Sequence, residues 1–104
     1  QERAGREISV RELLDWQERG ERFQLIDVRE PHEYEAWNLG AELMPLSTLA
    51  NAAGQIARDI KVVVHCRSGA RSAKAIRELE DRFGFDNLYN LRGGILAYRE
   101  EQGG

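Results

Sequence analysis

Cysteine is almost absent from this sequence of 104 residues, which contains only Cys66. A single cysteine cannot close a disulfide within the chain, and no other cysteine stands at the spacing of a structural zinc site. We therefore expect a reducing, cytoplasmic setting and no bound metal ion.

Long apolar runs and an excess of basic charge are also lacking. No run approaches the roughly 20 apolar residues that a membrane-spanning helix needs. The 15 Lys and Arg residues face 18 Asp and Glu residues, which leaves a net charge of −3. Binding to a phosphate backbone normally requires a concentrated basic face, so we expect neither a membrane nor a nucleic acid partner.

Methionine is scarce as well, since Met44 is the only one and the sequence begins at Gln1. This beginning is compatible with a processed protein or with a domain cut from a longer chain. The length suits one compact domain, which we place at residues 8–100, between flexible segments at 1–7 and 101–104.

Short apolar runs alternate with segments of helical spacing along the whole chain. The pattern predicts strands at 23–28, 42–44, 60–65 and 87–91, and helices at 9–20, 31–37, 47–57 and 72–83, with a last helix from residue 95. A strand, a helix and a strand over this length form a unit that requires parallel pairing. The expected fold class is therefore α/β, with a central, mainly parallel sheet of short strands and helices on both faces.

Cys66 follows the most apolar strand and precedes a short basic turn that contains glycine. A thiol is reactive as its thiolate, and the pKa of a free cysteine is about 8.5. The start of a helix near Arg71 or Ser72, the charges of Arg67 and Arg71, and backbone amides turned inward at Gly69 would all lower that pKa. A lone cysteine is more often a small buried apolar residue, but that interpretation leaves two arginines and a glycine in the next five positions unexplained.

Asp27 and Arg29 stand where the strand at 23–28 turns from apolar to charged. The carboxyl ends of parallel strands share one edge of the sheet, so both residues are expected near Cys66. We interpret them as supporting residues that form an ion pair or fix a loop, with direct catalysis as the alternative.

The size of the turn separates two kinds of chemistry that both hold an anion over a thiolate. Four residues lie between Cys66 and Arg71, whereas cysteine-dependent phosphatases place five between theirs. A smaller ring of amides suits a single sulfur atom better than a phosphoryl group. Sulfur transfer is therefore favoured, and a small-loop cysteine phosphatase stays open as the alternative.

Three groups of residues then carry a resemblance to a known family, namely 26–29 with 33–34, then 63–72, and 87–95. In this order they resemble the rhodanese (sulfurtransferase) homology domain in its single-domain form. The resemblance implies that Cys66 cycles through a persulfide, without a metal or organic cofactor. It also implies that the loop binds the persulfide or an anion through Arg67, Ser68, Gly69, Ala70, Arg71 and Ser72. Some members of the family are non-catalytic regulatory modules, but those often lack the cysteine.

The implied reaction takes sulfur from thiosulfate or a protein persulfide and passes it to a thiophilic acceptor. The sequences of residues 29–35 and 66–69 are most similar to those of rhodanese domains at the C-terminus of ubiquitin-activating-like adenylyltransferases. Those enzymes serve molybdopterin or thiamine synthesis. This similarity implies a fused adenylyltransferase domain and a sulfur-carrier protein ending in Gly-Gly as partners. Residues 37–41 depart from the family's usual Gly-His-Ile-x-Gly-Ala segment, which puts the shape of that loop in doubt. Although the chain itself ends in Gly103-Gly104, its βα alternation excludes the carrier's mainly antiparallel fold.

Overall fold

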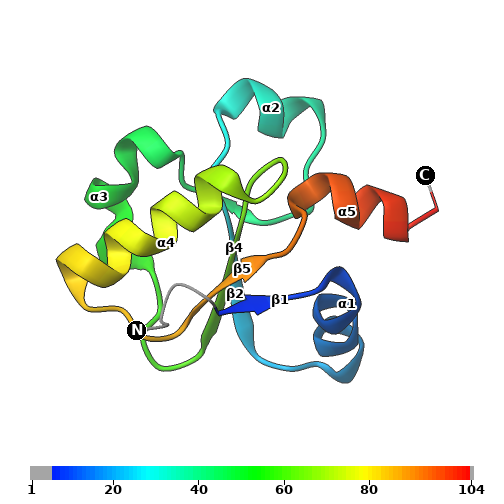
Figure 1. Cartoon of the computed structure of the whole chain (residues 1–104), viewed down its shortest axis with the longest axis horizontal. Coiled ribbons are helices and arrows are strands. Elements are labelled where there is room, and N and C mark those ends of the chain that lie inside the picture. The colour runs from blue at the N-terminus through cyan, green and yellow to red at the C-terminus, as the bar shows by residue number, and fades with distance from the viewer. Residues whose placement is uncertain (1–5, 104) are drawn as a thin grey trace.

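A five-stranded parallel sheet forms the centre of the computed structural model, which describes residues 6–103 (Figure 1). The strands lie in the order β1–β5–β4–β2–β3, and every pairing is parallel. Their bounds are β1 Glu7–Ile8, β2 Phe23–Asp27, β3 Glu42–Leu43, β4 Lys61–His65 and β5 Leu88–Leu91. With helices on both faces of the sheet, the predicted fold class is confirmed.

β4 is the central strand, paired with β2 on one side and β5 on the other. Its three consecutive valines, Val62, Val63 and Val64, are fully buried. Val62 and Val64 face one core cluster and Val63 faces the other, because side chains alternate across a strand. Burial on both faces is what a run of β-branched residues favours in a parallel sheet.

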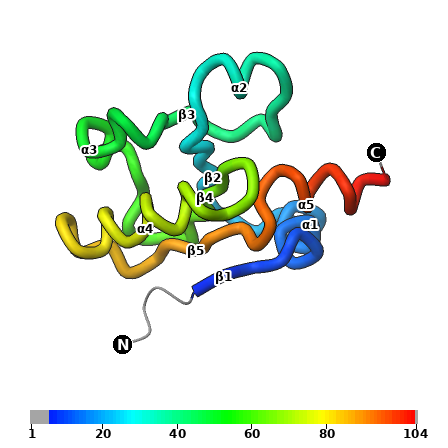
Figure 2. The backbone as a smooth tube through the Cα atoms, turned by 45° about the horizontal axis from the view of Figure 1, so that its top comes forward, coloured from blue at the N-terminus to red at the C-terminus, as the bar shows by residue number. Residues whose placement is uncertain are grey.

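The helices form one layer on each face of the sheet (Figures 1 and 2). α3 (Leu49–Ala52) and α4 (Ala70–Phe83) cover one face, where Leu49, Ile76 and Leu79 pack in the core with Val62 and Val64. α1 (Val10–Arg19) and α5 (Gly94–Glu101) cover the other face. α2 (Pro31–Ala36) directly follows β2 and lies beyond the carboxyl edge of the sheet.

The first helix begins and ends where the sequence predicts. Ser9 Oγ accepts a hydrogen bond from the Glu12 amide at 3.1 Å, and the Ser9 amide donates to Glu12 Oε1 at 2.9 Å. This reciprocal capping box satisfies two N–H groups at the helix start. Gly20 ends the helix with a φ of 72°, in the left-handed region that glycine adopts without strain.

The helix expected at 47–57 is wrong as a single element. The segment consists of a 3-10 turn at Leu46–Thr48, the four-residue α3, and a second 3-10 turn at Ala53–Gln55. An interior glycine costs about 1 kcal/mol relative to alanine in a helix, and Gly54 stands in the second turn. Propensity here is too weak to hold a continuous α-helix, and 3-10 geometry is common at the ends of short helices.

β1 was not expected, because two residues are too few to show a period. Glu7 pairs with Asn90 and Ile8 pairs with Leu91, so this strand exists only through β5. The flexible ends expected at 1–7 and 101–104 lie partly outside the described residues. Within the described part, Glu7 belongs to the sheet and Glu101 is the last residue of α5.

In the part of the chain that the structure describes, no helix has the length and apolar character to span a bilayer.

Candidate active site

The site lies at the carboxyl edge of the sheet, where β4 runs into α4. Cys66 follows the last residue of β4, and α4 begins at Ala70, close to the predicted helix start. The three residues between them turn the chain, and Gly69 takes a φ of 114° there. That value lies in the region that favours glycine, so the sequence of the turn suits its shape.

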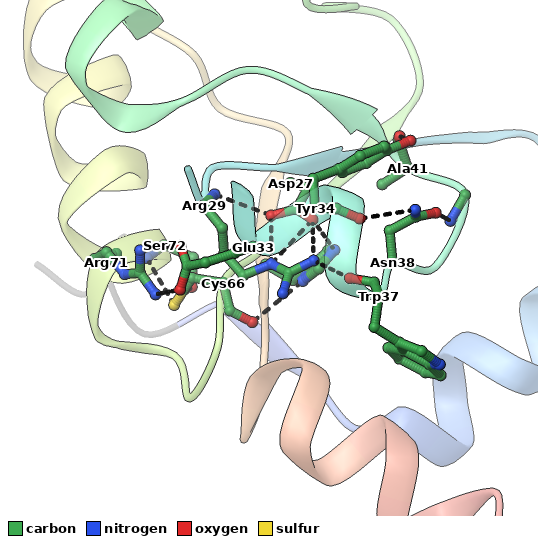
Figure 3. Close-up of polar contacts among 12 residues, drawn as sticks. Asp27, Arg29, Glu33, Tyr34, Trp37, Asn38, Ala41, Cys66, Arg71 and Ser72 are labelled. Atoms are coloured by element: carbon green, nitrogen blue, oxygen red, sulfur yellow. Dashed lines mark hydrogen bonds and ion pairs between the residues drawn. The ribbon is translucent and has the colours of Figure 1, made fainter. Parts of the chain in front are cut away.

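Cys66 is buried, and hydrogen-bond donors from the loop point at its sulfur (Figure 3). The Gly69 amide lies 3.1 Å from Cys66 Sγ, and the Ser72 amide lies 3.4 Å from it. The Ser72 hydroxyl oxygen is also 3.4 Å from the sulfur. The loop therefore closes around one sulfur atom and can stabilise negative charge on it.

Two opposing effects act on the pKa of Cys66. Burial raises the pKa, but hydrogen bonds from Ser72 and from the amides of Gly69 and Ser68 lower it by more. The result is a pKa below the ordinary thiol value, in the direction predicted from the sequence. Of the three causes predicted from the sequence, the hydrogen bonds of the loop are the ones that lower the pKa of Cys66, joined by the Ser72 hydroxyl, which was not predicted.

The two loop arginines differ in their surroundings. Arg67 is exposed. Arg71 donates two hydrogen bonds to the Glu33 carboxylate, at 2.8 and 3.0 Å. The bond from Arg71 lowers the pKa of Glu33 to about 2. Glu33 therefore offsets part of the positive charge that Arg71 brings to the loop.

Asp27 and Arg29 form a buried ion pair beside this contact (Figure 3). Arg29 Nη2 lies 2.9 Å from Asp27 Oδ2, and Arg29 Nε lies 3.0 Å from Asp27 Oδ1. Arg29 Nη2 also donates to the Trp37 carbonyl at 2.7 Å. These bonds connect the end of β2 to the end of α2. The ion pair therefore holds α2, the helix that carries Glu33, in position beside the loop.

The turn after β5 supports the cysteine loop through the backbone. The Ile95 amide donates to the Cys66 carbonyl at 2.9 Å, and the Leu96 amide donates to the Arg67 carbonyl at 3.1 Å. A Cβ atom at Gly94 would lie 2.6 Å from the Cys66 oxygen and 2.5 Å from the Arg67 oxygen. Only glycine at position 94 allows this approach of the two backbones.

Three residues that sequence reasoning missed contribute to the site. Glu33 pairs with Arg71, as described above. Asn90 contacts Ser72 and Gly69 from β5. His65 is fully buried, with Nδ1 3.2 Å from the Cys66 carbonyl oxygen, and burial lowers the pKa of its ring. The signals in the sequence were a polar residue inside an apolar strand at Asn90 and His65, and the place of Glu33 in the segment 33–34 that carries the family resemblance.

Residues 9–101 match the family model described as Rhodanese-like domain. The chain belongs to this family.

Relatives of this rhodanese-like domain include two proteins whose names state a sulfurtransferase. The chain is 36% identical over 100 residues to the "Probable adenylyltransferase/sulfurtransferase MoeZ" of Mycobacterium tuberculosis, covering 93% of this chain and 25% of the relative. It is 37% identical over 75 residues to a "Sulfurtransferase" of Allochromatium vinosum, covering 71% of this chain and 69% of the relative. The chain thus spans a quarter of the longer relative.

A solved structure supports the same family. The rhodanese-related protein from Thermoplasma volcanium is 32% identical, with a TM-score of 0.77 and 92% of each chain covered.

Within residues 6–103 of our rhodanese-like domain, no three His, Cys, Asp or Glu side chains are grouped to hold a metal ion. At the centre of the candidate site, the Gly69 and Ser72 amides surround the Cys66 sulfur.

Proposed function

We propose that this chain is a sulfurtransferase that carries sulfane sulfur as a persulfide on Cys66. The observation that carries the proposal is the convergence of the Gly69 amide, the Ser72 amide and the Ser72 hydroxyl on the Cys66 sulfur, at 3.1 to 3.4 Å. The names of the two relatives support the same reaction class.

In the first step, the Cys66 thiolate attacks the outer sulfur of a donor such as thiosulfate. A sulfur–sulfur bond forms at Cys66 while the sulfur–sulfur bond of thiosulfate breaks, and sulfite leaves with the bonding electron pair. The terminal sulfur of the persulfide keeps the negative charge that it carried as the outer sulfur of thiosulfate. Amides of residues 67–72 would stabilise that charge, and exposed Arg67 would attract the anionic donor.

In the second step, a nucleophilic acceptor attacks the terminal sulfur and the Cys66 thiolate leaves. Cyanide would yield thiocyanate in an assay. Neither step requires a metal or an organic cofactor, because each exchanges one sulfur–sulfur or sulfur–carbon bond for another.

The donor in a cell would be thiosulfate or a protein persulfide, and the acceptor a sulfur-carrier protein ending in Gly-Gly. The adenylyltransferase part of the MoeZ name supports this pairing, and a fused adenylyltransferase is the corresponding partner. The proposed compartment is the cytoplasm, where a single cysteine stays reduced.

The test is intact-mass analysis after incubation with thiosulfate and removal of excess reagent. Wild-type protein should gain the mass of one sulfur atom and lose it on addition of cyanide, whereas Cys66→Ser should gain nothing. A wild-type chain without the added mass, from either thiosulfate or a persulfide donor, would overturn the proposal. Release of phosphate from an aryl phosphate would instead favour the phosphatase alternative, and inactivity in both assays would favour a regulatory module.

A further inference from the structure

The side chain of Asn90 bridges the cysteine loop from β5. Its Nδ2 donates to the Gly69 carbonyl at 3.1 Å, and its Oδ1 lies 2.6 Å from Ser72 Oγ. A carbonyl oxygen only accepts hydrogen bonds, so the amide nitrogen must face Gly69. The Asn90 oxygen therefore faces Ser72, and Ser72 must be the donor in that contact.

The Ser72 hydroxyl has one hydrogen and three acceptors within reach. These are Asn90 Oδ1 at 2.6 Å, the Gly69 carbonyl at 3.2 Å and Cys66 Sγ at 3.4 Å. An O–H···O bond is optimal near 2.7 Å, and Ser72, Cys66 and Asn90 are all buried, with Ser72 fully so. In this arrangement the Ser72 hydroxyl donates its hydrogen bond to Asn90 Oδ1, and the Cys66 sulfur is left with the backbone amides of the loop as its donors.

We propose that Asn90 is a positioning residue that holds the Ser72 hydrogen away from Cys66 while the sulfur is a neutral thiol and releases it to the sulfur when a thiolate or persulfide anion forms. The proposal rests on the proposed function of Cys66. The hydrogen stays on the Ser72 oxygen throughout, and only the direction of the O–H bond changes.

The charge on the sulfur decides which acceptor the Ser72 hydroxyl bonds. A bond from a hydroxyl to an anionic sulfur is stronger than one to a neutral amide oxygen, because the acceptor carries a full charge. A neutral thiol is a weak acceptor, so the amide oxygen wins when the sulfur is protonated. Because of Asn90, the Ser72 hydroxyl donates only to the charged forms of the sulfur. The Ser72–Asn90 hydrogen bond breaks when it does so.

Ionisable groups from several elements surround this cluster: Arg67 lies in the loop itself, and Asp27 Oδ2 at the end of β2 lies 3.6 Å from His65 Nε2. His65 contacts the Cys66 carbonyl from β4, and Arg71 on α4 is paired with Glu33 on α2. None of these residues changes in the variants below, so their effects on the sulfur are shared by all four proteins compared.

The test is a double-mutant cycle on the pKa of Cys66. The wild type, Asn90→Ala, Ser72→Ala and the double variant are titrated by the pH dependence of alkylation with iodoacetamide. Without Asn90, the remaining competitor is the Gly69 carbonyl, which at 3.2 Å is farther from the Ser72 hydroxyl than Asn90 Oδ1 is at 2.6 Å, so Ser72 loses a weaker bond when it turns to the thiolate. Asn90→Ala should therefore lower the pKa of Cys66 more when residue 72 is serine than when it is alanine. The difference between the two shifts should be about half a pH unit or more.

Equal shifts in the two backgrounds would overturn the proposal, since a purely structural Asn90 acts on the loop whether or not Ser72 has a hydroxyl. The proposal would also be overturned if Asn90→Ala raised the pKa of Cys66 more with serine at position 72 than with alanine there. If circular dichroism shows that Asn90→Ala does not fold, Asn90→Asp takes its place in the cycle. The carboxylate is a stronger acceptor, so Asn90→Asp should raise the pKa more with Ser72 than with Ala at position 72. Alkylation needs no sulfur donor, so a failure of sulfur transfer leaves this result readable.

Discussion

Glu33 and Arg71, 38 residues apart in the sequence, form a two-bond ion pair, with N–O distances of 2.8 and 3.0 Å. The contact joins α2, which follows β2, to the first turn of α4, which follows the cysteine loop. Parallel bonds between a guanidinium and a carboxylate fix orientation as well as distance. Glu33 therefore sets both the position and the effective charge of the arginine nearest the helix start.

Replacing Glu33 by glutamine should increase the affinity of the site for an anionic donor. The variant leaves the charge of Arg71 unbalanced near the loop, and one unit charge at about 4 Å in water is worth about 1 kcal/mol. We expect the KM for thiosulfate to fall about five-fold at low salt and the difference to shrink as salt is added. Glu35→Gln on the exposed side of α2 is the matched control and should leave KM unchanged. A KM that rises in Glu33→Gln would show that orientation of Arg71 matters more than its charge.

The same pair predicts a pH dependence of stability. The pKa of Glu33 is about 2 in the folded chain and 4.5 ordinarily, so ionised Glu33 stabilises the fold above about pH 4.5. That contribution is lost as the pH falls from 4.5 through about 2, where Glu33 becomes protonated in the folded state too. The difference in Tm between wild type and Glu33→Gln should be constant from neutral pH to about pH 5 and close by about pH 2. A difference that persists at pH 2 would argue against the ion pair as its source.

Cys66 should react with alkylating agents as a thiolate with a lowered pKa. Hydrogen bonds from Ser72 and Gly69 outweigh burial, so the rate of reaction with iodoacetamide should reach half its maximum at a lower pH than for a free thiol. Ser72→Ala removes one donor and should move that midpoint upward. Cys66→Ser, which has no thiol, supplies the background rate. A wild-type midpoint at or above the free value would mean that desolvation dominates.

Asp27→Asn should destabilise the fold strongly. The variant keeps the shape of the side chain but leaves the Arg29 charge buried without its carboxylate, and removal of one partner of a buried pair costs about 3–5 kcal/mol. The free energy of unfolding in urea measures this loss. Arg82→Ala breaks an exposed pair with Glu78 and should cost no more than about 0.5 kcal/mol. Similar losses in the two variants would contradict a structural role for the buried pair.

Gly94→Ala should displace the cysteine loop. Its Cβ would meet the backbone oxygens of Cys66 and Arg67 at 2.6 and 2.5 Å, and its φ of 61° is unfavourable for alanine. We expect a loss of about 2 kcal/mol or more in stability and reduced formation of thiocyanate from thiosulfate and cyanide. Gly54→Ala is the control, because its Cβ would meet nothing within 4 Å, and it should be neutral or stabilise by up to about 1 kcal/mol. Full activity in Gly94→Ala would show that the loop tolerates movement.

Much of the site was accessible from the sequence because it is local. Cys66, Gly69 and Ser72 lie within seven consecutive residues, so a strand followed by a helix is enough to bring their amides to the sulfur. The βα alternation likewise predicted the parallel sheet. The contacts of Glu33 and Asn90 could not be predicted in this way, since each reaches the loop from a different element, α2 and β5.

The sequence by itself determined that Cys66 stands in a small loop between a strand and a helix, and it determined the alternation of strands and helices, because these depend on residue type and short spacing. Only the tertiary structure decided how the loop is held. The order of the strands places β5 beside β4, which brings Asn90 to Ser72 and the Gly94 turn against the backbone of Cys66. It also places α2 at the same edge, where Glu33 offsets the charge of Arg71. Contacts between segments 18 and 38 residues apart follow from chain packing, which local spacing does not encode.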